Sequence, residues 1–502
     1  MLLDNDSCTR ALESRDVRFD GVFFVGIVTT GIYCRPICPA RATKRKNRRF
    51  FSNAAAAERG GFRPCLRCRP ELAPGRARVD AVPRLADAAA RRIAAGALNG
   101  QNVEALATEL GVSGRQLRRA LHHELGVSPI GLAQTHRLLL AKQLIAQTRL
   151  PMTQVAFASG FQSLRRFNAL FREQYRLNPL TLRRARAQTS TAAARRANDP
   201  DVGDTVSLSL SYRPPLAWDA LLTFLAARAT PGVELVEDGW YARTISIDGH
   251  MGVVRVGNPD AKVTTRSGSG YPTCQLRVHL DMSLLPVLMP LTARLRHLFD
   301  LDAEPEVIAS HFRRMGGDLL HGSPRGVRVP GAVDAFELAV RAVLGQQVTV
   351  KGATTLMGRF VASFGTALPA GETDTRLTYL SPAAGRVAAA SIDDIRAIGI
   401  PRSRAESIRA VAGAIASGAV RISSDTDVRA TARALSELPG IGPWTIEYIT
   451  MRAAHWPDAF PSTDIVLQRN AGGLTSAKLL RVAESWRPWR AYAAMLLWMK
   501  GR

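Results

Sequence analysis

The sequence predicts a multidomain α+β protein in which helices outnumber strands. Its 502 residues exceed what one hydrophobic core normally supports, so about three to four domains are expected. Alternation of apolar and polar residues, which favours strands, is confined to the stretch "GVFFVGIVTT" and to parts of residues 205–288. The remainder repeats its apolar residues mostly at helical spacing and is broken by glycine and proline.

Changes in composition divide the chain into five segments. We expect a small α/β domain over 1–76, an all-α double helix-turn-helix domain over 80–186, a linker over 187–204, a small antiparallel β-plus-helix domain over 205–288 and an all-α domain with a helix-hairpin-helix over 289–502. The linker is predicted because "RAQTSTAAARRANDPDVGD" is small, polar and poor in apolar residues, which is typical of a flexible connection.

The net charge indicates the kind of partner. Lysine and arginine number 67 against 42 aspartate and glutamate, a formal charge of +25. Such an excess favours an acidic polymer over a small metabolite as partner, with nucleic acid first and an anionic membrane surface as the alternative.

The compartment follows from what the sequence lacks. It has no apolar run of about 18 residues, and its first residues are acidic where a signal peptide would be basic and then apolar. We therefore expect a soluble, cytoplasmic protein with no membrane partner. Disulfides are rare in that reducing setting, so clustered cysteines indicate a metal or a reaction.

Four of the six cysteines form two close pairs. Cys34 and Cys38 are separated by three residues, Cys65 and Cys68 by two, and 26 residues lie between the pairs. Two such chelating turns suit one tetrahedral Zn²⁺ ion with four thiolate ligands. The alternative is that these are buried cysteines acting as small apolar side chains.

Basic residues surround the predicted zinc site. A Zn²⁺ ion with four thiolates has a net charge of about −2, and its sulfurs remain nucleophilic. Arg35 and Arg41 belong to a basic run that would bring a phosphate backbone to these sulfurs despite their charge. We take both arginines as candidate DNA contacts.

The motifs "TTGIYCRPICPAR" and "GFRPCLRCRP" resemble the N-terminal domain of the Ada family of bacterial adaptive-response proteins. The resemblance covers residues 20–70 and implies that Cys34 accepts a methyl group from a methylphosphotriester in DNA; spacing alone does not select it among the four. Methylating one thiolate removes one negative charge, which should tighten DNA binding. A structural zinc knuckle without methyl transfer is the alternative.

Two helix-turn-helix patterns follow, in "NVEALATELGVSGRQLRRALHHELGVSP" and "MTQVAFASGFQSLRRFNALFREQYRLNP". The signature "GFQS" with "RFNALFRE" resembles the AraC-type DNA-binding domain. That resemblance implies that helices beginning near Ser113 and Gln162 enter successive major grooves, with Arg176 standing where the family has a C-cap glycine. Base or phosphate contacts are expected from Arg115, Arg118, Arg165 and Arg166, with a solvated surface as the alternative for each.

The stretch "LSELPGIGPWTIEYITMRA" predicts a hairpin between two helices. Gly440 and Gly442 leave backbone N–H groups and a helix N-terminus facing outward, which can hold a DNA phosphate. Together with the downstream "WPDAFPSTDIVLQR", this stretch resembles the helix-hairpin-helix DNA glycosylases, specifically the 3-methyladenine glycosylase II family. The resemblance extends back to the β-plus-helix unit and covers about 300 residues.

The glycosylase resemblance implies roles for several residues. Asp464 would be the catalytic carboxylate, stabilising the positive charge that develops on deoxyribose or positioning the attacking water. The alternative for Asp464 is a helix N-cap, which contributes about 1 kcal/mol to stability. Trp444 and Tyr448 share one helical face and would stack on a flipped, cationic base, with plain core packing as their alternative.

The chain departs from the glycosylase family at some positions. Gln346 and Gln347 are expected to bind substrate, but Gln347 stands where the compared family member has an apolar wedge, and Thr463 where a second acid can precede the catalytic one. The second hairpin helix has no lysine that could form a Schiff base, so we predict a monofunctional enzyme that leaves an abasic site. We expect Glu447 to lie at the surface.

The predicted protein is therefore a fusion. No "PCHR" motif of an O6-methylguanine methyltransferase is present, and a glycosylase takes its place. We expect a monomer that acts on alkylated double-stranded DNA and on promoter sites, with RNA polymerase as a further candidate partner and methylation of Cys34 as the switch for transcription. The alternative is a transcriptional regulator whose glycosylase-like half only binds DNA.

Overall fold

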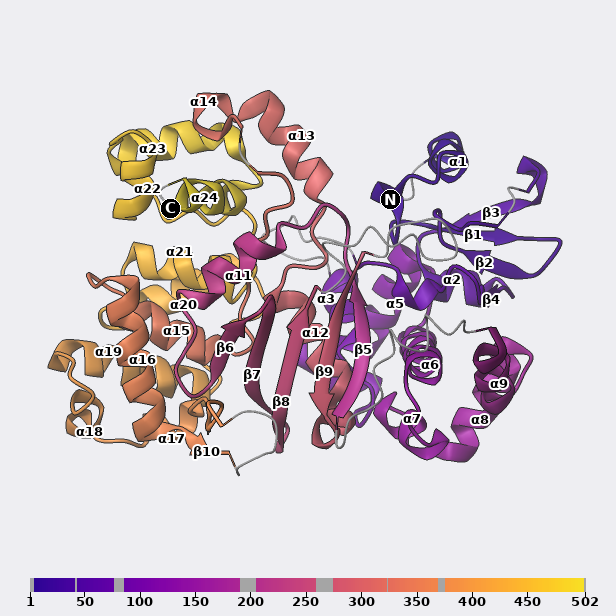
Figure 1. Ribbon diagram of the computed structural model, residues 1–502, viewed down its shortest axis with the longest axis horizontal. Coiled ribbons are helices and arrows are strands. Elements are labelled where there is room, and N and C mark those ends of the chain that lie inside the picture. Colours follow the sequence, from indigo (N-terminus) through magenta and orange to yellow (C-terminus); the bar gives the residue numbers. More distant parts are fainter. Residues whose placement is uncertain are drawn as a thin grey trace.

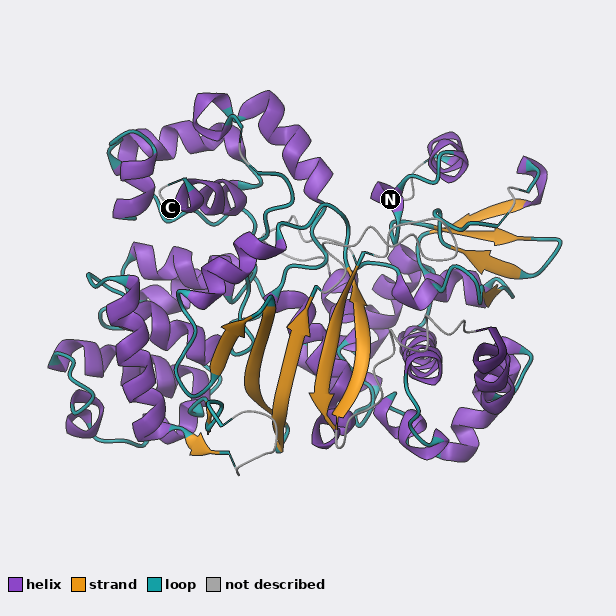
Figure 2. Cartoon of the chain, viewed as in Figure 1, coloured by secondary structure: helices purple, strands orange, loops and turns teal. Residues whose placement is uncertain are grey.

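The computed structural model describes residues 4–40, 43–75, 85–189, 205–258, 274–322, 324–368 and 375–500. Helices dominate and strands form one small N-terminal sheet, one five-stranded sheet and a short two-stranded ribbon (Figure 2). This confirms the predicted mixed fold, with its small cysteine-rich domain, helix-turn-helix region, β-sheet domain and helix-hairpin-helix domain.

The N-terminal sheet has the strand order β3-β1-β2-β4. Its elements are α1 (Asn5–Glu13), β1 (Phe24–Ile27), β2 (Ile32–Cys34), β3 (Arg48–Phe51), α2 (Ala54–Arg59) and β4 (Arg63–Pro64). Strands β1 and β2 are antiparallel, and β2 pairs in parallel with β4. Because β2 ends at Cys34 and β4 ends one residue before Cys65, this parallel pair brings the two cysteine turns together.

Seven helices form the double helix-turn-helix region: α3 (Leu85–Ala94), α4 (Val103–Glu109), α5 (Gly114–Leu125), α6 (Pro129–Gln147), α7 (Met152–Ala158), α8 (Leu164–Tyr175) and α9 (Pro179–Thr189). Helix α5 starts with a reciprocal cap between Ser113 and Gln116. Arg176 ends α8 with φ 60°, so the chain keeps the left-handed C-cap without a glycine. Of the predicted linker, 187–189 are helical and the rest lies outside the described residues.

The five-stranded sheet is antiparallel in the order β5-β9-β8-β7-β6. Its elements are β5 (Thr205–Ser211), α11 (Trp218–Ala226), β6 (Glu234–Glu237), β7 (Trp240–Ile247), β8 (His250–Gly257) and β9 (Gln275–Asp281), followed by η5 (Met282–Val287) and α12 (Leu288–Leu298). An antiparallel sheet with a helix is thus found where the small β-plus-helix unit was expected.

The C-terminal part is helical. It comprises α13 (Pro305–Met315), α14 (Gly317–Leu320), α15 (Ala335–Leu344), α16 (Val350–Phe364), β10 (Thr366–Ala367), β11 (Tyr379–Leu380), α17 (Ala384–Ala388), α18 (Ile392–Arg396), α19 (Arg402–Ala416), α20 (Val428–Ser436), α21 (Pro443–Arg452), α22 (Ile465–Asn470), α23 (Ser476–Ala483) and α24 (Arg490–Met499). No helix in the described part of the chain combines the length and apolarity needed to span a bilayer.

The five-stranded sheet lies between the N-terminal and the C-terminal domains (Figure 1). The helical C-terminal part stands beyond β6, and the N-terminal domain and helix-turn-helix region stand on the β5 side. One continuous apolar core contains Leu144 and Phe171 of the helix-turn-helix region together with Val206 and Leu208 of β5. The composition of the linker did not predict that the two halves share a core.

Candidate metal centre and candidate DNA site

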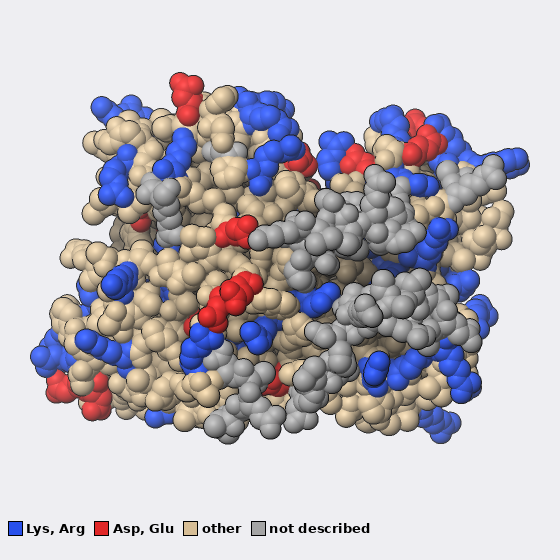
Figure 3. Space-filling model, in the orientation of Figure 1, with Lys and Arg blue, Asp and Glu red and all other residues tan. Residues whose placement is uncertain are grey.

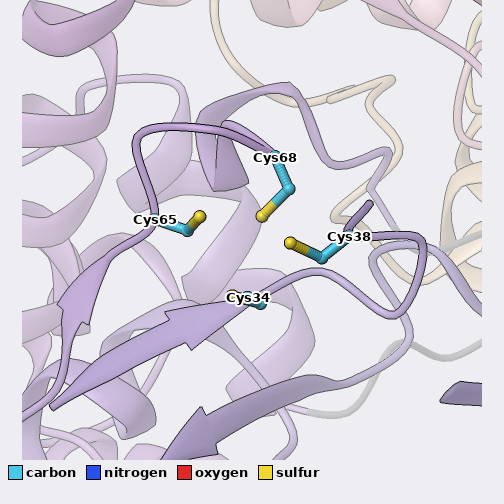
Figure 4. A group of neighbouring side chains, drawn as sticks. All are labelled: Cys34, Cys38, Cys65 and Cys68. Atoms are coloured by element: carbon cyan, nitrogen blue, oxygen red, sulfur yellow. The ribbon is translucent and has the colours of Figure 1, made fainter. Parts of the chain in front are cut away.

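The four paired cysteines form one cluster. Each side chain is only 7–8% exposed, and their sulfur atoms all lie within 4.8 Å of one another. Figure 4 shows the four side chains pointing toward a common centre. The backbone N–H of Arg35 donates to Cys68 Sγ at 3.4 Å. Turns that direct N–H groups at the sulfurs suit negatively charged ligands.

The cluster fits a tetrahedral cation. Sulfurs bound to one Zn²⁺ at about 2.3 Å would lie about 3.8 Å apart, within the observed spread. Hydrogen bonding with Cys38 raises the pKa of Cys34, while hydrogen bonding with Cys34 lowers the pKa of Cys65. The sulfurs are close enough to perturb one another in opposite directions, and a divalent cation would let all four become thiolates.

Arg35 has a different position from the one expected. Its side chain is buried, donates to both carboxylate oxygens of Asp20, and donates through Nη1 to the carbonyl of Cys68 at 3.1 Å. This corrects the expectation of a DNA contact, because in this conformation the guanidinium braces the cysteine turn instead of facing solvent. Arg41 lies outside the described residues.

A lysine that sequence reasoning missed also contacts the cluster. Lys142 of α6 is 2% exposed, and its Nζ donates to the carbonyl of Cys65 at 3.0 Å and to Glu71 at 2.5 Å. A lone lysine inside the apolar run "LLLAKQLIA" was the available signal. Nearby, burial raises the pKa of Glu58 to about 7, while hydrogen bonds from Thr135 of α6 and from Tyr33 oppose that shift.

The arginines predicted to contact DNA from the helix-turn-helix region are all exposed. They lie on α5 and α8: Arg115, Arg118, Arg165 and Arg166. Arg118 is paired with Glu104 at 2.6 Å, an exposed contact of little energetic weight that DNA phosphate can replace. Figure 3 shows basic side chains spread over both ends of the visible face.

Asp464 is held by two indoles. Its Oδ1 accepts from the backbone N–H of Leu467 at 2.9 Å and from Trp498 Nε1 at 3.1 Å, and its Oδ2 accepts from Trp444 Nε1 at 2.9 Å. The carboxylate therefore caps α22 while its second oxygen is fixed beside an aromatic ring. The two interpretations of Asp464, a catalytic carboxylate and a helix N-cap, are therefore compatible with each other. Trp498 comes 34 residues later in the chain, and no local spacing indicated it.

The aromatic side chains around Asp464 come from two domains. Trp444 and Tyr448 stack with centroids 5.2 Å apart and an interplanar angle of 11°. Trp498 meets Tyr448 edge-on at 6.3 Å and also contacts Phe224 of α11. The helical domain and the sheet domain therefore both contribute rings to one cluster next to the carboxylate.

Arg452, at the end of α21, anchors this cluster. It donates to the hydroxyl of Tyr448 at 2.9 Å and to the carbonyls of Pro330 and Gly331 at 2.8 and 2.9 Å. Burial by itself would raise the pKa of Tyr448, but the charge of Arg452, followed by that of Arg228, lowers it to about 8.

Replacing Arg452 with Gln should move this titration. We expect the pKa of Tyr448 to rise above 8, because the cation that stabilises the tyrosinate is gone, and the Michaelis constant for alkylated DNA to rise about tenfold as the ring loses its anchor. Tyrosinate absorbance against pH and steady-state kinetics measure the two effects. Arg433→Gln, on the exposed face of α20, should change neither; an unshifted titration in Arg452→Gln would contradict the assignment.

The predicted hairpin joins α20 to α21. Gly440 has φ 74°, and a Cβ there would lie 2.1 Å from Ser407 Oγ. Gly442 caps α21, with Pro443 at its first position, and has open space beside it. The turn therefore requires glycine at 440, and the helix N-terminus stays accessible at 442.

Gly440→Ala should weaken DNA binding more than Gly442→Ala. The first variant must tolerate both a positive φ and a clash with Ser407, which predicts a loss of about 1–3 kcal/mol in unfolding free energy and a distorted hairpin. The second meets no atom within 4 Å and serves as the matched control. Urea unfolding and titration of a labelled duplex measure the two effects, and equal affinities would contradict this role of the turn.

The two glutamines differ in position. Gln346 Nε2 donates to the carbonyl of Gly440 and to Thr445 Oγ1, both at 2.9 Å. The backbone carbonyl of Gln346 accepts from Arg404 at 2.7 Å. Gln347 is exposed with φ 56°. Gln346 thus braces the hairpin, whereas Gln347 projects from the loop beside it.

Glu447 lies partly inside the protein, contrary to expectation. Its carboxylate accepts from the backbone N–H of Phe460 at 2.8 Å, and burial raises its pKa. It anchors the segment that leads from α21 to Asp464.

Family models match four consecutive parts of the chain. They are the metal binding domain of Ada at residues 7–71, a helix-turn-helix domain at 106–185, the AlkA N-terminal domain at 207–334 and the HhH-GPD superfamily of base excision DNA repair proteins at 340–480. With the sulfur cluster and the Asp464 site, they define a class of protein: an Ada-type metal-binding and helix-turn-helix region joined to an AlkA-like glycosylase fold.

Relatives extend over the same parts. A probable bifunctional transcriptional activator/DNA repair enzyme AlkA of Mycobacterium tuberculosis is 39% identical, over 99% of this chain and 96% of its own. DNA-3-methyladenine glycosylase 2 of Escherichia coli is 35% identical over 58% of this chain and 96% of its own. The regulatory protein ada of Salmonella typhimurium is 33% identical over 32% of this chain and 44% of its own. The chain belongs to the family of AlkA-type bifunctional transcriptional activator/DNA repair enzymes.

Proposed function

We propose that this protein repairs alkylated DNA in the cytoplasm and regulates the response to it. The observation that supports this most directly is the clamped carboxylate of Asp464 beside an aromatic cluster and a helix-hairpin-helix, in the same chain as a four-sulfur centre. We divide the chain into the metal-binding domain (1–76), the DNA-reading domain (80–186), a linker (187–204) and the two glycosylase domains (205–288 and 289–502).

In the first activity, Cys34 removes a methyl group from a methylphosphotriester. The C–O bond of the ester breaks, an S–C bond forms at Cys34 Sγ, and the phosphodiester anion leaves. The four cysteines would hold Zn²⁺, which would keep the sulfur anionic near neutral pH. The thioether is stable, so each molecule reacts once. The resemblance to the Ada family is what supports Cys34 as the acceptor among the four.

The methylated protein would act as the regulator. Loss of one negative charge at the sulfur centre reduces repulsion from phosphate, so promoter DNA should bind more tightly to α5 and α8. Arg115, Arg118, Arg165 and Arg166 are the proposed contacts. RNA polymerase as partner and a monomeric state complete this proposal.

In the second activity, the C-terminal half hydrolyses the N-glycosidic bond of an alkylated base such as 3-methyladenine. The flipped base stacks on Trp444 and Tyr448, whose electron-rich faces favour a cationic ring. Asp464 stabilises the positive charge that develops on the sugar or orients the attacking water. The hairpin at Gly440 and Gly442 holds the phosphate, and Gln347 projects toward the gap that the base leaves.

One incubation tests both activities. Zinc-loaded protein is mixed with methylated DNA, and intact mass, metal content and released bases are followed together. We expect a gain of about 14 Da per molecule, together with free 3-methyladenine and an abasic product strand that stays uncleaved. Absence of the mass gain would overturn the methyl-acceptor role, and absence of free base would overturn the glycosylase role.

A further inference from the structure

Helix α6 contacts the sulfur centre on one side. Lys142 Nζ lies 3.0 Å from the carbonyl oxygen of Cys65, a predicted metal ligand, and 2.5 Å from Glu71. Both charged side chains are almost fully buried. A buried cation this close to the centre is stabilised by the negative charge of the sulfurs as well as by Glu71.

The next residue of α6 contacts the C-terminal half of the chain. We call residues 1–186 the regulatory half and residues 205–502 the repair half. Gln143 Nε2 donates to the carbonyl of Ser209 at 2.7 Å, and the backbone N–H of Ser209 donates to Gln147 Oε1 at 3.1 Å. Ser209 lies on β5, the edge strand of the five-stranded sheet (Figure 1). Two glutamine side chains thus satisfy the outward-facing backbone groups of Ser209 on this edge strand, and Leu144 packs in the same core as Val206.

A second connection starts from the other cysteine turn. Arg35 contacts the carbonyl of Cys68 and pairs with Asp20, whose own carbonyl accepts from Arg213 Nη2 at 3.0 Å. Arg213 belongs to the repair half, is 2% exposed, and donates through Nη1 to the carbonyl of Asp302 at 3.0 Å. Each cysteine turn is therefore linked through a buried cation to the sheet domain.

The charge of the centre bears on both connections. Four thiolates around one Zn²⁺ have a net charge of about −2, and a methyl group on one sulfur reduces it to about −1. Lys142 and Arg35 are the buried cations that contact the ligand turns, so their attraction to the centre falls when the methyl group arrives. The same two side chains belong to two of the several connections between the halves.

We propose that α6 and Arg213 dock the repair half onto the regulatory half, and that methylation of Cys34 loosens this docking by weakening the hold of the sulfur centre on Lys142 and Arg35. The proposal rests on the proposed role of Cys34 as methyl acceptor. Since coupling between two sites is reciprocal, a variant that undocks the halves should resemble the methylated protein.

Amide hydrogen exchange tests the docking directly. The full-length, zinc-loaded chain is methylated with phosphotriester DNA, freed from DNA at high salt and checked by intact mass. We expect amides of β5 and of the second half of α6 to exchange about tenfold faster after methylation, whereas the pairing of β7 with β8 stays protected. Unchanged exchange in β5 of protein that has gained the methyl mass would overturn the docking proposal and leave the methyl-acceptor role standing.

Two variants complete the test. In the double variant Gln143→Ala/Gln147→Ala, the amides of β5 should exchange rapidly before methylation, and methylation should not increase their exchange rate further. Gln154→Ala, an exposed glutamine of α7, is the matched control and should behave like the original chain. A double variant that still responds to methylation would also overturn the proposal. If the original chain gains no methyl mass, the methyl-acceptor role is wrong, and the docking proposal, which depends on that role, is wrong as well.

Discussion

Asp464→Asn should reduce the release of 3-methyladenine by about a hundredfold to a thousandfold. The variant keeps a side-chain oxygen for the N–H of Leu467, so the cap of α22 and the fold should survive. It loses the negative charge, and the amide nitrogen that replaces Oδ2 cannot accept from Trp444 Nε1, whereas the remaining oxygen can still accept from Trp498 Nε1. Single-turnover release of free base from alkylated DNA measures the effect.

Asp427→Asn provides the control for this prediction. Asp427 caps α20 in the same domain through the same kind of contact, but no indole within the described residues donates to it. Its replacement should leave base release unchanged. If Asp464→Asn also released base at the original rate, excision would not depend on this carboxylate, and the alternative of a regulator whose glycosylase-like half only binds DNA would be favoured.

Cys34→Ser should abolish the gain of methyl mass. A serine hydroxyl is not ionised near neutral pH, so the nucleophile is lost together with one of the four metal ligands. We also expect weaker zinc retention and a lower melting temperature of the N-terminal domain, because metal binding contributes to the folding of such small domains. Mass spectrometry, metal analysis and thermal unfolding measure the three effects.

Cys274→Ser is the matched control for Cys34→Ser. Cys274 precedes β9 and lies outside the four-sulfur cluster. Its replacement should preserve both the zinc and the methyl mass. A Cys34→Ser protein that still gained one methyl group would show that another sulfur is the acceptor, while the glycosylase prediction would be unaffected.

Local sequence patterns were sufficient to predict much of the fold and part of each candidate site. The spacing of Cys34, Cys38, Cys65 and Cys68 indicates a metal centre because chelating turns are short-range structures. The hairpin around Gly440 and the alternation of residues within 205–288 likewise depend on turn chemistry and periodicity. These features need only a few neighbouring residues, so the sequence expresses them directly.

Contacts between distant segments were not predictable in this way. Trp498 reaches Asp464 from the last helix, and Lys142 reaches Cys65 across 77 residues. Arg35 was expected to contact DNA because it belongs to the basic run around the cysteines, but Asp20 pairs with it inside the fold. In each case the partner is fixed by tertiary packing, for which periodicity and motif spacing provide no signal.

The glutamine contacts to β5 have a consequence for any attempt to separate the two halves of the chain. A fragment that starts at Thr205 would expose the outward-facing backbone groups of Ser209 to solvent, and an uncovered strand edge readily recruits another strand. Such a fragment would tend to self-associate edge to edge. By contacting that edge, residues of α6 should therefore limit the self-association of the C-terminal half.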